Sequence, residues 1–495
     1  MVAGATGSSS AIPQHPRRGP GPTASSLRDW LAFDERPALI EFAMTLPGRA
    51  LLFGCFALLL ACALPLRSVP FVLAGCAAAA FLRERRDVAV LSATFACLML
   101  DPSWYTDPNF EAYLAQLDPG VLSPRSWQRL LTVGLFAVSA LSLRLVVWRP
   151  QGLFARRPVV CLLGVLSLLS ALTLSLTDKP FWLVLSIKLL ASYMWFMCYA
   201  VIDQRSQQRS STLFALGLFR PFWGSSSTPI GKGAGYLAKL RCDDPRELAQ
   251  LQLKGLKLLA WSLVLRGASL TLTAATQRAG IPELSSVVQA FSLGEPHHAS
   301  VGWIAIVTAV AVGGLELAVW GHRVVACARL AGYRLRRNTW RPLASRSLAD
   351  FWNRYYFYFK ELLLDFFFYP TFFRVFKRQP RLRTFCATFM AAGVGNAIYH
   401  FARDIDRLFN LGAGVALGGF GAYMFYCTML AGGIAISQLR AGSAPRERGP
   451  LRIVWSFVCV WGFVCCLQVF GAIEDPTLPF TTRVAFMLHQ FGVNP

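Results

Sequence analysis

Charge is scarce in this chain, and acidic charge is the scarcest. Charged residues make up 15% of the 495 positions, whereas 55% are hydrophobic. A soluble domain usually carries about 25% charge. From residue 48 almost to the C-terminus, apolar runs follow one another and leave no room for a soluble catalytic domain. The composition therefore excludes a soluble enzyme and predicts an integral membrane protein.

Two common kinds of ligand-binding motif are also missing. The 13 cysteines form no CxxC pair and mostly lie inside apolar runs, as Cys55, Cys76 and Cys97 do. This pattern predicts small buried side chains rather than a metal site or a disulfide framework. The glycine-rich segment 231–235 lacks the spacing and the hydroxyl that a phosphate-binding loop needs. No residue is predicted to bind a cofactor.

The apolar runs themselves predict the fold. A helix needs about 20 mostly apolar residues to cross the hydrocarbon core of a membrane. We expect an all-α, polytopic transmembrane bundle of about 11–12 spans, with re-entrant or broken helices among them. The predicted spans are residues 48–66, 69–83, 88–100, 129–147, 158–176, 180–202, 253–275, 302–321, 384–401, 410–437, 452–473 and 479–493.

Basic residues gather in alternate loops. The net charge is +23, but its distribution follows the positive-inside bias of membrane proteins rather than a nucleic-acid surface. The loop 101–118 of the opposite set carries Asp101, Asp107, Glu111 and Asp118. We therefore expect a cytoplasmic N-terminus in a cell inner membrane, no nucleic-acid partner, and contact of the basic loops with membrane lipid. The predicted inner loops are 83–87, 148–157, 203–250, 322–345, 374–383 and 440–452.

The chain divides into a tail and one domain. Residues 1–37 are rich in Gly, Pro, Ser and Ala and have no apolar core, so they are predicted to form a flexible cytoplasmic tail. Residues 38–495 are predicted to form a single multi-pass membrane domain.

Residues 346–376 combine many aromatic side chains with charges that are unusual at membrane depth. If the segment is one helix, Arg354, Tyr358, Glu361 and Asp365 share a face. Ionisable residues inside a membrane are costly and usually pair or face a cavity. Charges that snorkel from an interfacial helix give the competing interpretation. We expect broken or re-entrant helices inside the protein.

A single histidine, His400, lies at the end of the apolar run 384–401. Asn396 precedes it by four residues and Asp404 follows it by four, so all three can share one helical face. Either neighbour is then placed to fix the tautomer of the imidazole. An imidazole with a near-neutral pKa is suited to take a proton from a hydroxyl nucleophile. A histidine that simply meets water at a helix end is the alternative.

These segments resemble the signature region of the membrane-bound O-acyltransferases. The resemblance is to the bacterial branch that includes alginate O-acetylation and teichoic-acid D-alanylation proteins. It covers about residues 220–405, and His400 falls where the family has its near-invariant histidine. Further positions that match or are similar are Phe351, Trp352, Arg354, Asp365, Phe366 and Pro370, and upstream Arg220-Pro221-Phe222 and Thr228-Pro229-Ile230.

One position departs from the family. Tyr356 stands where the family usually has His, Asn or Asp, and Asn353 lies one helical turn before it. Either residue can supply the polar partner of His400, so the predicted catalytic set is His400, Asn353 and Tyr356. Arg354, Glu361 and Asp365 are expected to hold the shape of the site through buried pairs.

The resemblance implies acyl transfer from an activated donor to a hydroxyl group. The co-substrate would be an acyl thioester, either acyl-coenzyme A or a carrier-linked group. The acceptor would be a polysaccharide, a lipid or a small metabolite, with an extracytoplasmic enzyme as an optional partner. Two alternatives stay open at this point. The chain can be a transporter or flippase, or a non-catalytic member of the same fold that binds a lipid or glycan.

Overall fold

The computed structural model describes residues 32–101, 107–206, 211–440, 449–471 and 478–493, and they form helices and loops without a strand. Seven helices in this part of the chain are long and apolar enough to cross a membrane. The chain is therefore a multi-pass, all-α membrane protein, as predicted. The seven helices are α7 (Pro124–Trp148), α9 (Pro158–Ser175), α10 (Phe181–Arg205), α13 (Pro245–Arg278), α15 (Ala299–Leu330), α22 (Ala413–Arg440) and α23 (Pro450–Gly471).

The other five predicted spans are also helical but shorter or broken. The first coincides with α3, which is joined to α2 at a bend of 98°. The ninth, residues 384–401, consists of α19, a π-helical segment and α20. The elements concerned are α2 (Pro37–Met44), α3 (Leu46–Ala61), α4 (Val69–Phe81), α5 (Arg86–Leu100), α19 (Pro380–Phe389), the π-helical segment Met390–Gly395, α20 (Asn396–Arg403) and α24 (Phe480–Gln490).

Many helices begin at signals that are local in the sequence. Asp244 accepts a hydrogen bond from the Glu247 backbone N–H and is followed by a proline, so it caps α13. Ser123 caps α7 in the same way. Shorter helices fill the connections: α6 (Pro108–Leu114), α8 (Leu153–Arg156), α11 (Thr212–Gly217), α12 (Ala234–Lys239), α14 (Leu284–Ser292), α16 (Leu348–Tyr355), α17 (Phe357–Leu363), α18 (Tyr369–Phe372) and α21 (Arg407–Asn410).

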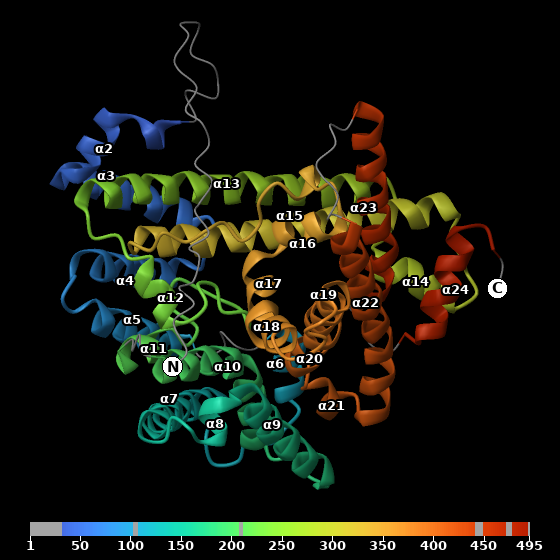
Figure 1. Ribbon diagram of the computed structural model, residues 1–495, viewed down its shortest axis with the longest axis horizontal. Helices are drawn as coiled ribbons and strands as arrows, with labels where there is room; N and C mark the ends of the chain where they lie inside the picture. Colours follow the sequence, from blue (N-terminus) through green and yellow to red (C-terminus); the bar gives the residue numbers. More distant parts are fainter. Residues whose placement is uncertain (1–31, 102–106, 207–210, 441–448, 472–477, 494–495) are drawn as a thin grey trace, which may run out of the picture.

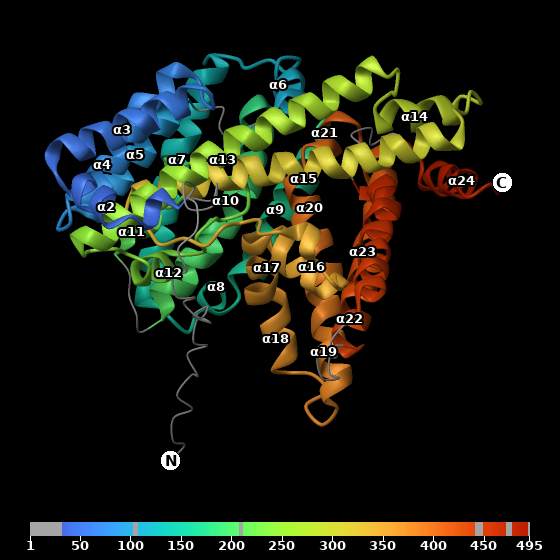
Figure 2. The ribbon, with the colours of Figure 1, turned by 90° about the horizontal axis from the view of Figure 1, so that it is seen from above.

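Two helix pairs and one central helix organise the molecule. α13 and α15 lie side by side and run across it, whereas α22 and α23 run transversely to them at one end (Figures 1 and 2). α10 is the most enclosed of the apolar helices, with 78% of its apolar window buried, compared with 22% for α13 and α23. α10 is therefore the core of the fold, and the faces of α13 and α23 are free to meet lipid.

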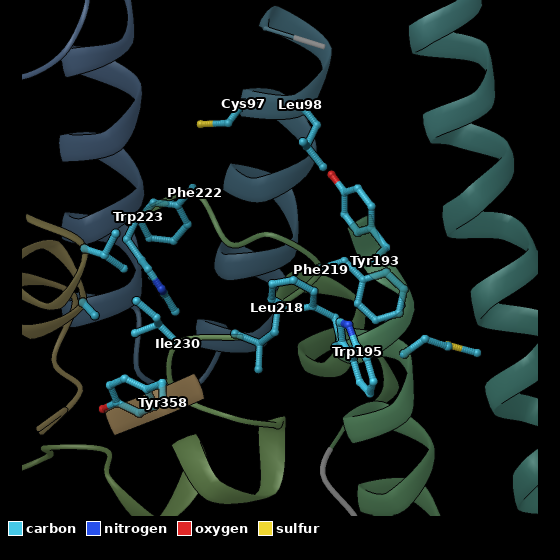
Figure 3. Packing of buried hydrophobic residues seen from close by; sticks show 14 of the residues in the cluster. Cys97, Leu98, Tyr193, Trp195, Leu218, Phe219, Phe222, Trp223, Ile230 and Tyr358 are labelled. Atoms are coloured by element: carbon cyan, nitrogen blue, oxygen red, sulfur yellow. The ribbon is translucent and has the colours of Figure 1, made fainter. Parts of the chain in front are cut away.

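The core around α10 is aromatic. Tyr193 of α10 packs against Phe219 in the loop after α11, and Phe222 of the same loop packs against Trp223 (Figure 3). The buried Lys188, nearer the start of α10, pairs with Asp406 after α20. Burial of a lysine in a span is costly unless it is paired. The helix thus ties the 218–233 loop and the end of α20 to one scaffold.

The last residues of the predicted tail are helical and are part of the domain. Residues 1–31 lie outside the described residues, but Phe33–Glu35 form a turn of 3-10 helix and α2 begins at Pro37. Asp34 is buried and its carboxylate lies 2.6 Å from Lys257 Nζ on α13. This ion pair attaches the segment to the domain, and the composition of residues 1–37 gave no sign of it.

The aromatic segment 346–376 is not one helix, because Asn338 from the preceding loop interrupts its hydrogen bonding. α16 ends at Tyr355 and α17 starts at Phe357. At this break the Phe357 N–H donates to the Asn338 carbonyl, and the Tyr358 N–H donates to Asn338 Oδ1. Asn338 therefore takes the donors that would have continued the helix. The segment is broken, as predicted, so the face that Arg354, Tyr358, Glu361 and Asp365 would share on one continuous helix does not form.

Two π-helical segments lie against each other next to the break. Leu364–Phe368 follows α17, and Met390–Gly395 leads into α20. A Cβ at Gly395 would come within 2.6 Å of the Phe367 ring, so only glycine permits this approach. π-helical turns often occur at functional sites. Here they bring the end of α17 close to the helix that carries His400.

Candidate active site around His400

His400 borders a cavity of about 300 Å³ between the broken segment and the transverse helices. The lining comes from five parts of the chain: the 218–233 loop, α15, the segment of α16 and α17, α20, and the pair α22 and α23. The cavity contains aromatic rings together with hydroxyl, amide and guanidinium groups. The polar and tyrosine side chains in the lining are Ser226, Ser227, Tyr355, Tyr356, Asn396, Tyr399, His400, Arg403, Tyr423, Tyr426 and Gln468.

Aromatic rings hold the imidazole in place. The centroid of the His400 ring lies 4.5 Å from that of Tyr423, 5.1 Å from that of Tyr399 and 5.7 Å from that of Phe359. His400 Nδ1 is buried and has no hydrogen-bond partner among the described residues. Packing therefore fixes the ring, and Nδ1 is not committed to a structural hydrogen bond.

The expected hydrogen bonds from neighbouring residues on α20 are not made. Asp404 instead accepts from Arg403 through both oxygens, at 2.6 and 2.8 Å. Burial opposes ionisation of Asp404, but this guanidinium outweighs burial and lowers the pKa of the carboxyl to about 2. Asn396 Oδ1 is buried without a partner and lines the cavity. The prediction that Asn396 or Asp404 orients His400 is therefore wrong.

The structure separates the two candidate partners of His400. Tyr356 lines the cavity, with its ring centroid 5.4 Å from that of Phe359. Asn353 is exposed and does not line the cavity, and its Oδ1 accepts a hydrogen bond of 3.3 Å from Lys360. Both lie on the segment that was singled out, but only Tyr356 lines the same cavity as His400. The helix break after Tyr355 turns the two side chains to different surroundings.

The 218–233 loop reaches the site from far away in the sequence. The Tyr399 hydroxyl lies 2.7 Å from Ser227 Oγ and 2.7 Å from Thr228 Oγ1. Ser226 and Ser227 also line the cavity. The segment around Thr228-Pro229-Ile230, which shares the family resemblance, thus contacts the residue next to His400.

A partly buried ion cluster lies beside the site, and its lysine was not expected from the sequence. Lys232 Nζ lies 3.2 Å from Glu361 Oε2 and 2.8 Å from Asp365 Oδ2. The Tyr199 hydroxyl of α10 donates to the same Asp365 oxygen at 2.8 Å. Burial lowers the pKa of Lys232, but the two carboxylates raise it by more, so the ammonium stays charged. Glu361 and Asp365 are therefore in ion pairs, as predicted, but the pairs are only partly buried, and Lys232 is the shared partner.

Arg354 is outside this cluster. Its Nε lies 2.6 Å from Asp350 one helical turn earlier, and its guanidinium stacks over the Trp340 ring. The glycine-rich segment 231–235 binds a carboxylate of the same chain, since the Gly235 N–H donates to Asp203 at 3.0 Å. A Cβ at Gly233 would collide with that carboxylate. The glycines therefore serve close packing against α10.

Several site residues were missed by sequence reasoning. Tyr423 and Tyr426 lie three residues apart on α22, so one face of an apolar span carries two hydroxyls. That pattern was a usable signal, because polar groups at membrane depth need partners or a cavity. Lys232 and the serines of the 218–233 loop gave no comparable signal. Their placement depends on the packing of the loop against α10 and α20.

Comparison of the chain with known protein families and with curated proteins found no match. The resemblance to the membrane-bound O-acyltransferases therefore stays a prediction. What the structure contributes is the geometry of the segments that carry it.

Proposed function

We propose that the protein is a membrane-embedded O-acyltransferase that moves an acyl group from a thioester to a hydroxyl, with His400 as general base. One observation supports this most strongly. Three segments that resemble the family, around residues 226–230, 351–359 and 396–403, are far apart in the sequence and meet around one cavity. His400, whose Nδ1 has no hydrogen-bond partner among the described residues, borders that cavity.

In the proposed reaction, the His400 imidazole takes the proton of the acceptor hydroxyl. The resulting oxygen attacks the thioester carbonyl, the carbon–sulfur bond breaks, and the thiolate leaves and takes up a proton. A positioned base of this kind contributes about 10² to 10⁴ in rate. The neutral imidazole is the form that accepts the proton.

Tyr356 is proposed to assist as a hydrogen-bond donor. Its hydroxyl is the polar group at the position where the family usually has His, Asn or Asp, and it lines the same cavity as His400. A donor aimed at the carbonyl oxygen stabilises the negative charge that develops there in the transition state. A tyrosine cannot act as a base at neutral pH, because its ordinary pKa is about 10. This division leaves proton abstraction to His400.

The size of the cavity favours a short acyl group. About 300 Å³ is at the lower end of small-molecule sites, which span roughly 300 to 1,000 Å³. An acetyl-sized group and part of an acceptor fill such a volume, whereas a long acyl chain exceeds it. The proposed acceptors remain a polysaccharide, a lipid or a metabolite that bears a hydroxyl.

The test is an acyl-transfer assay in proteoliposomes with a radiolabelled acyl thioester and cell-envelope extract as acceptor. Wild-type protein should release thiol and form labelled ester together, and His400→Ala should do neither while inserting into the membrane at the same level. Full ester formation by well-folded His400→Ala protein contradicts the proposal. Substrate movement across the bilayer without ester formation indicates a transporter. Saturable retention of label without turnover indicates a binding protein.

We also propose that the basic loops face the cytoplasm and that the protein lies in the inner membrane. The support is the one-sided distribution of arginines among the connections between helices. Cysteine labelling of the loops 203–250, 322–345 and 440–451 should succeed only after the membrane is permeabilised. Labelling of any two of them from outside intact cells contradicts this orientation.

A further inference from the structure

Three of the basic connections meet at an open pocket away from the His400 cavity. The turn after α7 and α8 supplies Arg156 and Arg157, the end of α10 supplies Arg205, and the turn after α18 supplies Arg374. The pocket has a volume of about 460 Å³, and Gln151 and Leu153 complete its lining. α8 and α18 can be followed in Figures 1 and 2. Positive charges from distant parts of the chain are therefore held close together.

These arginines are not neutralised by the protein. No Asp or Glu is among the described residues that line the pocket. Arg157, Arg205 and Arg374 form no ion pair with a residue that the structure describes. Arg156 donates only to the neutral Gln151 side chain, at 2.6 and 3.1 Å. Guanidinium groups gathered in this way repel one another and favour a bound phosphate, which they bind through paired hydrogen bonds.

Exposed apolar side chains lie beside the pocket, as is typical of a protein surface that meets lipid headgroups. Trp148, the last residue of α7, is 73% exposed, and Leu153 in the pocket lining is 68% exposed. The Arg149 guanidinium lies over the Trp148 ring, with its carbon 4.8 Å from the ring centroid. Tryptophan is enriched where the hydrocarbon meets the headgroups. An exposed leucine next to arginines suits a ligand that has both an acyl chain and a phosphate.

We propose that this pocket binds the phosphate headgroup of an anionic phospholipid, with the acyl chains of the lipid along Leu153 and Trp148. The site does not depend on the proposed acyl transfer, because none of its residues lines the His400 cavity. It assigns a specific lipid site to charges that otherwise serve only to orient the chain in the membrane.

The test is native mass spectrometry of the purified full-length chain with phosphatidylglycerol or phosphatidylcholine of identical acyl chains. Wild-type protein should bind phosphatidylglycerol preferentially. The double variant Arg157→Gln/Arg205→Gln should bind it about thirtyfold more weakly, as expected for the loss of two arginines near an anionic headgroup. The matched control is Arg83→Gln/Arg85→Gln, which removes two exposed arginines from the turn between α4 and α5 and should retain wild-type binding.

Equal binding by both double variants contradicts the proposal, because general attraction to positive charge then accounts for the preference. A soluble phosphate is the other source of the same chemistry. If adenosine 3',5'-bisphosphate stabilised the protein in phosphatidylcholine nanodiscs and phosphatidylglycerol did not, the pocket would serve a soluble ligand and the lipid assignment would fail.

Discussion

Two polar regions lie side by side in the protein and differ in how their groups are satisfied. In the cluster around Lys232, the ammonium and both carboxylates are paired, and Tyr199 donates to Asp365. In the His400 cavity, His400 Nδ1 and Asn396 Oδ1 are buried without partners among the described residues. Buried polar groups are normally hydrogen-bonded, so each exception needs an explanation.

This difference indicates different roles. In a fully paired cluster no polar group is left to bind a ligand. Removal of the cluster therefore destabilises the fold. In a cavity whose buried polar groups lack partners, the desolvation of those groups is not compensated. A ligand that supplies the missing hydrogen bonds compensates it. We therefore assign the Lys232 cluster to folding and the His400 cavity to chemistry. The predictions below are ordered from the largest expected effect to the smallest.

The largest effect is expected on activity at His400. His400→Gln should reduce acyl transfer by about 10² to 10⁴, because the amide cannot act as a base. Its thermal stability should stay near that of wild type, since glutamine retains much of the volume. The measurement is initial rate of ester formation together with the unfolding midpoint in detergent.

His322 on α15 is the matched control for that variant. It is also buried and has an Nδ1 without a partner, but it does not line the cavity. His322→Gln should therefore keep wild-type acyl transfer. Equal losses in the two variants would show that any buried histidine is needed for the fold, and the catalytic assignment would fall.

The next effect is on stability at the ion cluster. Lys232→Met should cost about 3–5 kcal/mol, because it leaves the Asp365 carboxylate without a cation. Asp365→Asn should cost less, because Lys232 keeps Glu361 as its partner. The double variant should cost less than the sum of the two, since removal of both partners leaves less uncompensated charge. Denaturant unfolding of the four proteins measures the coupling. Lys239→Met, an exposed lysine on α12, is the control and should be silent. If the losses of unfolding free energy in the two single variants simply added in the double variant, Lys232 and Asp365 would not stabilise each other.

A smaller effect distinguishes Tyr356 from Asn353. Tyr356→Phe removes only a hydroxyl in the cavity and should lower the rate of transfer by roughly a hundredfold, the lower end of the range for loss of one donor. Asn353→Ala changes an exposed side chain and should leave the rate unchanged. The ratio of kcat to KM for each variant decides between them. The reverse order of effects would mean that the break between α16 and α17 rearranges when substrate binds.

The smallest effect is expected at the partly exposed pair Asp350–Arg354. Asp350→Asn should destabilise the protein by only about 0.3–0.5 kcal/mol, the range for an ion pair one turn apart on a helix. Acyl transfer should not change. A loss comparable to that of Asp365→Asn in the same unfolding experiment would place Asp350 in the essential architecture with the Lys232 cluster.

The helices were predictable because the information is local. Each of the 12 predicted spans coincides with a helix or a broken helix, and run length alone separates α7 and α10 from shorter elements such as α24. The break at Tyr356 was predictable in kind but not in place. No Pro or Gly marks it, and its cause is Asn338, which lies 18 or more residues away and captures the backbone donors.

The site was predictable only in part for the same reason. His400 stood out as the one histidine of an apolar run and Tyr356 through its place in the family resemblance, and both line the cavity. The partners of Asp365 were hidden, because Lys232 and Tyr199 are more than 130 residues away and no spacing rule connects them. Helical periodicity wrongly assigned Asp404 to His400, since it ignored the adjacent Arg403.

The most direct test of the central claim is a cryo-EM structure with a non-hydrolysable acyl-thioester analogue. We predict density for the acyl group in the cavity, with its carbonyl oxygen within hydrogen-bond distance of the Tyr356 hydroxyl and its carbon facing the His400 imidazole. Density for the acyl group at any other place, with the His400 cavity filled by lipid or left without ligand, would contradict the account.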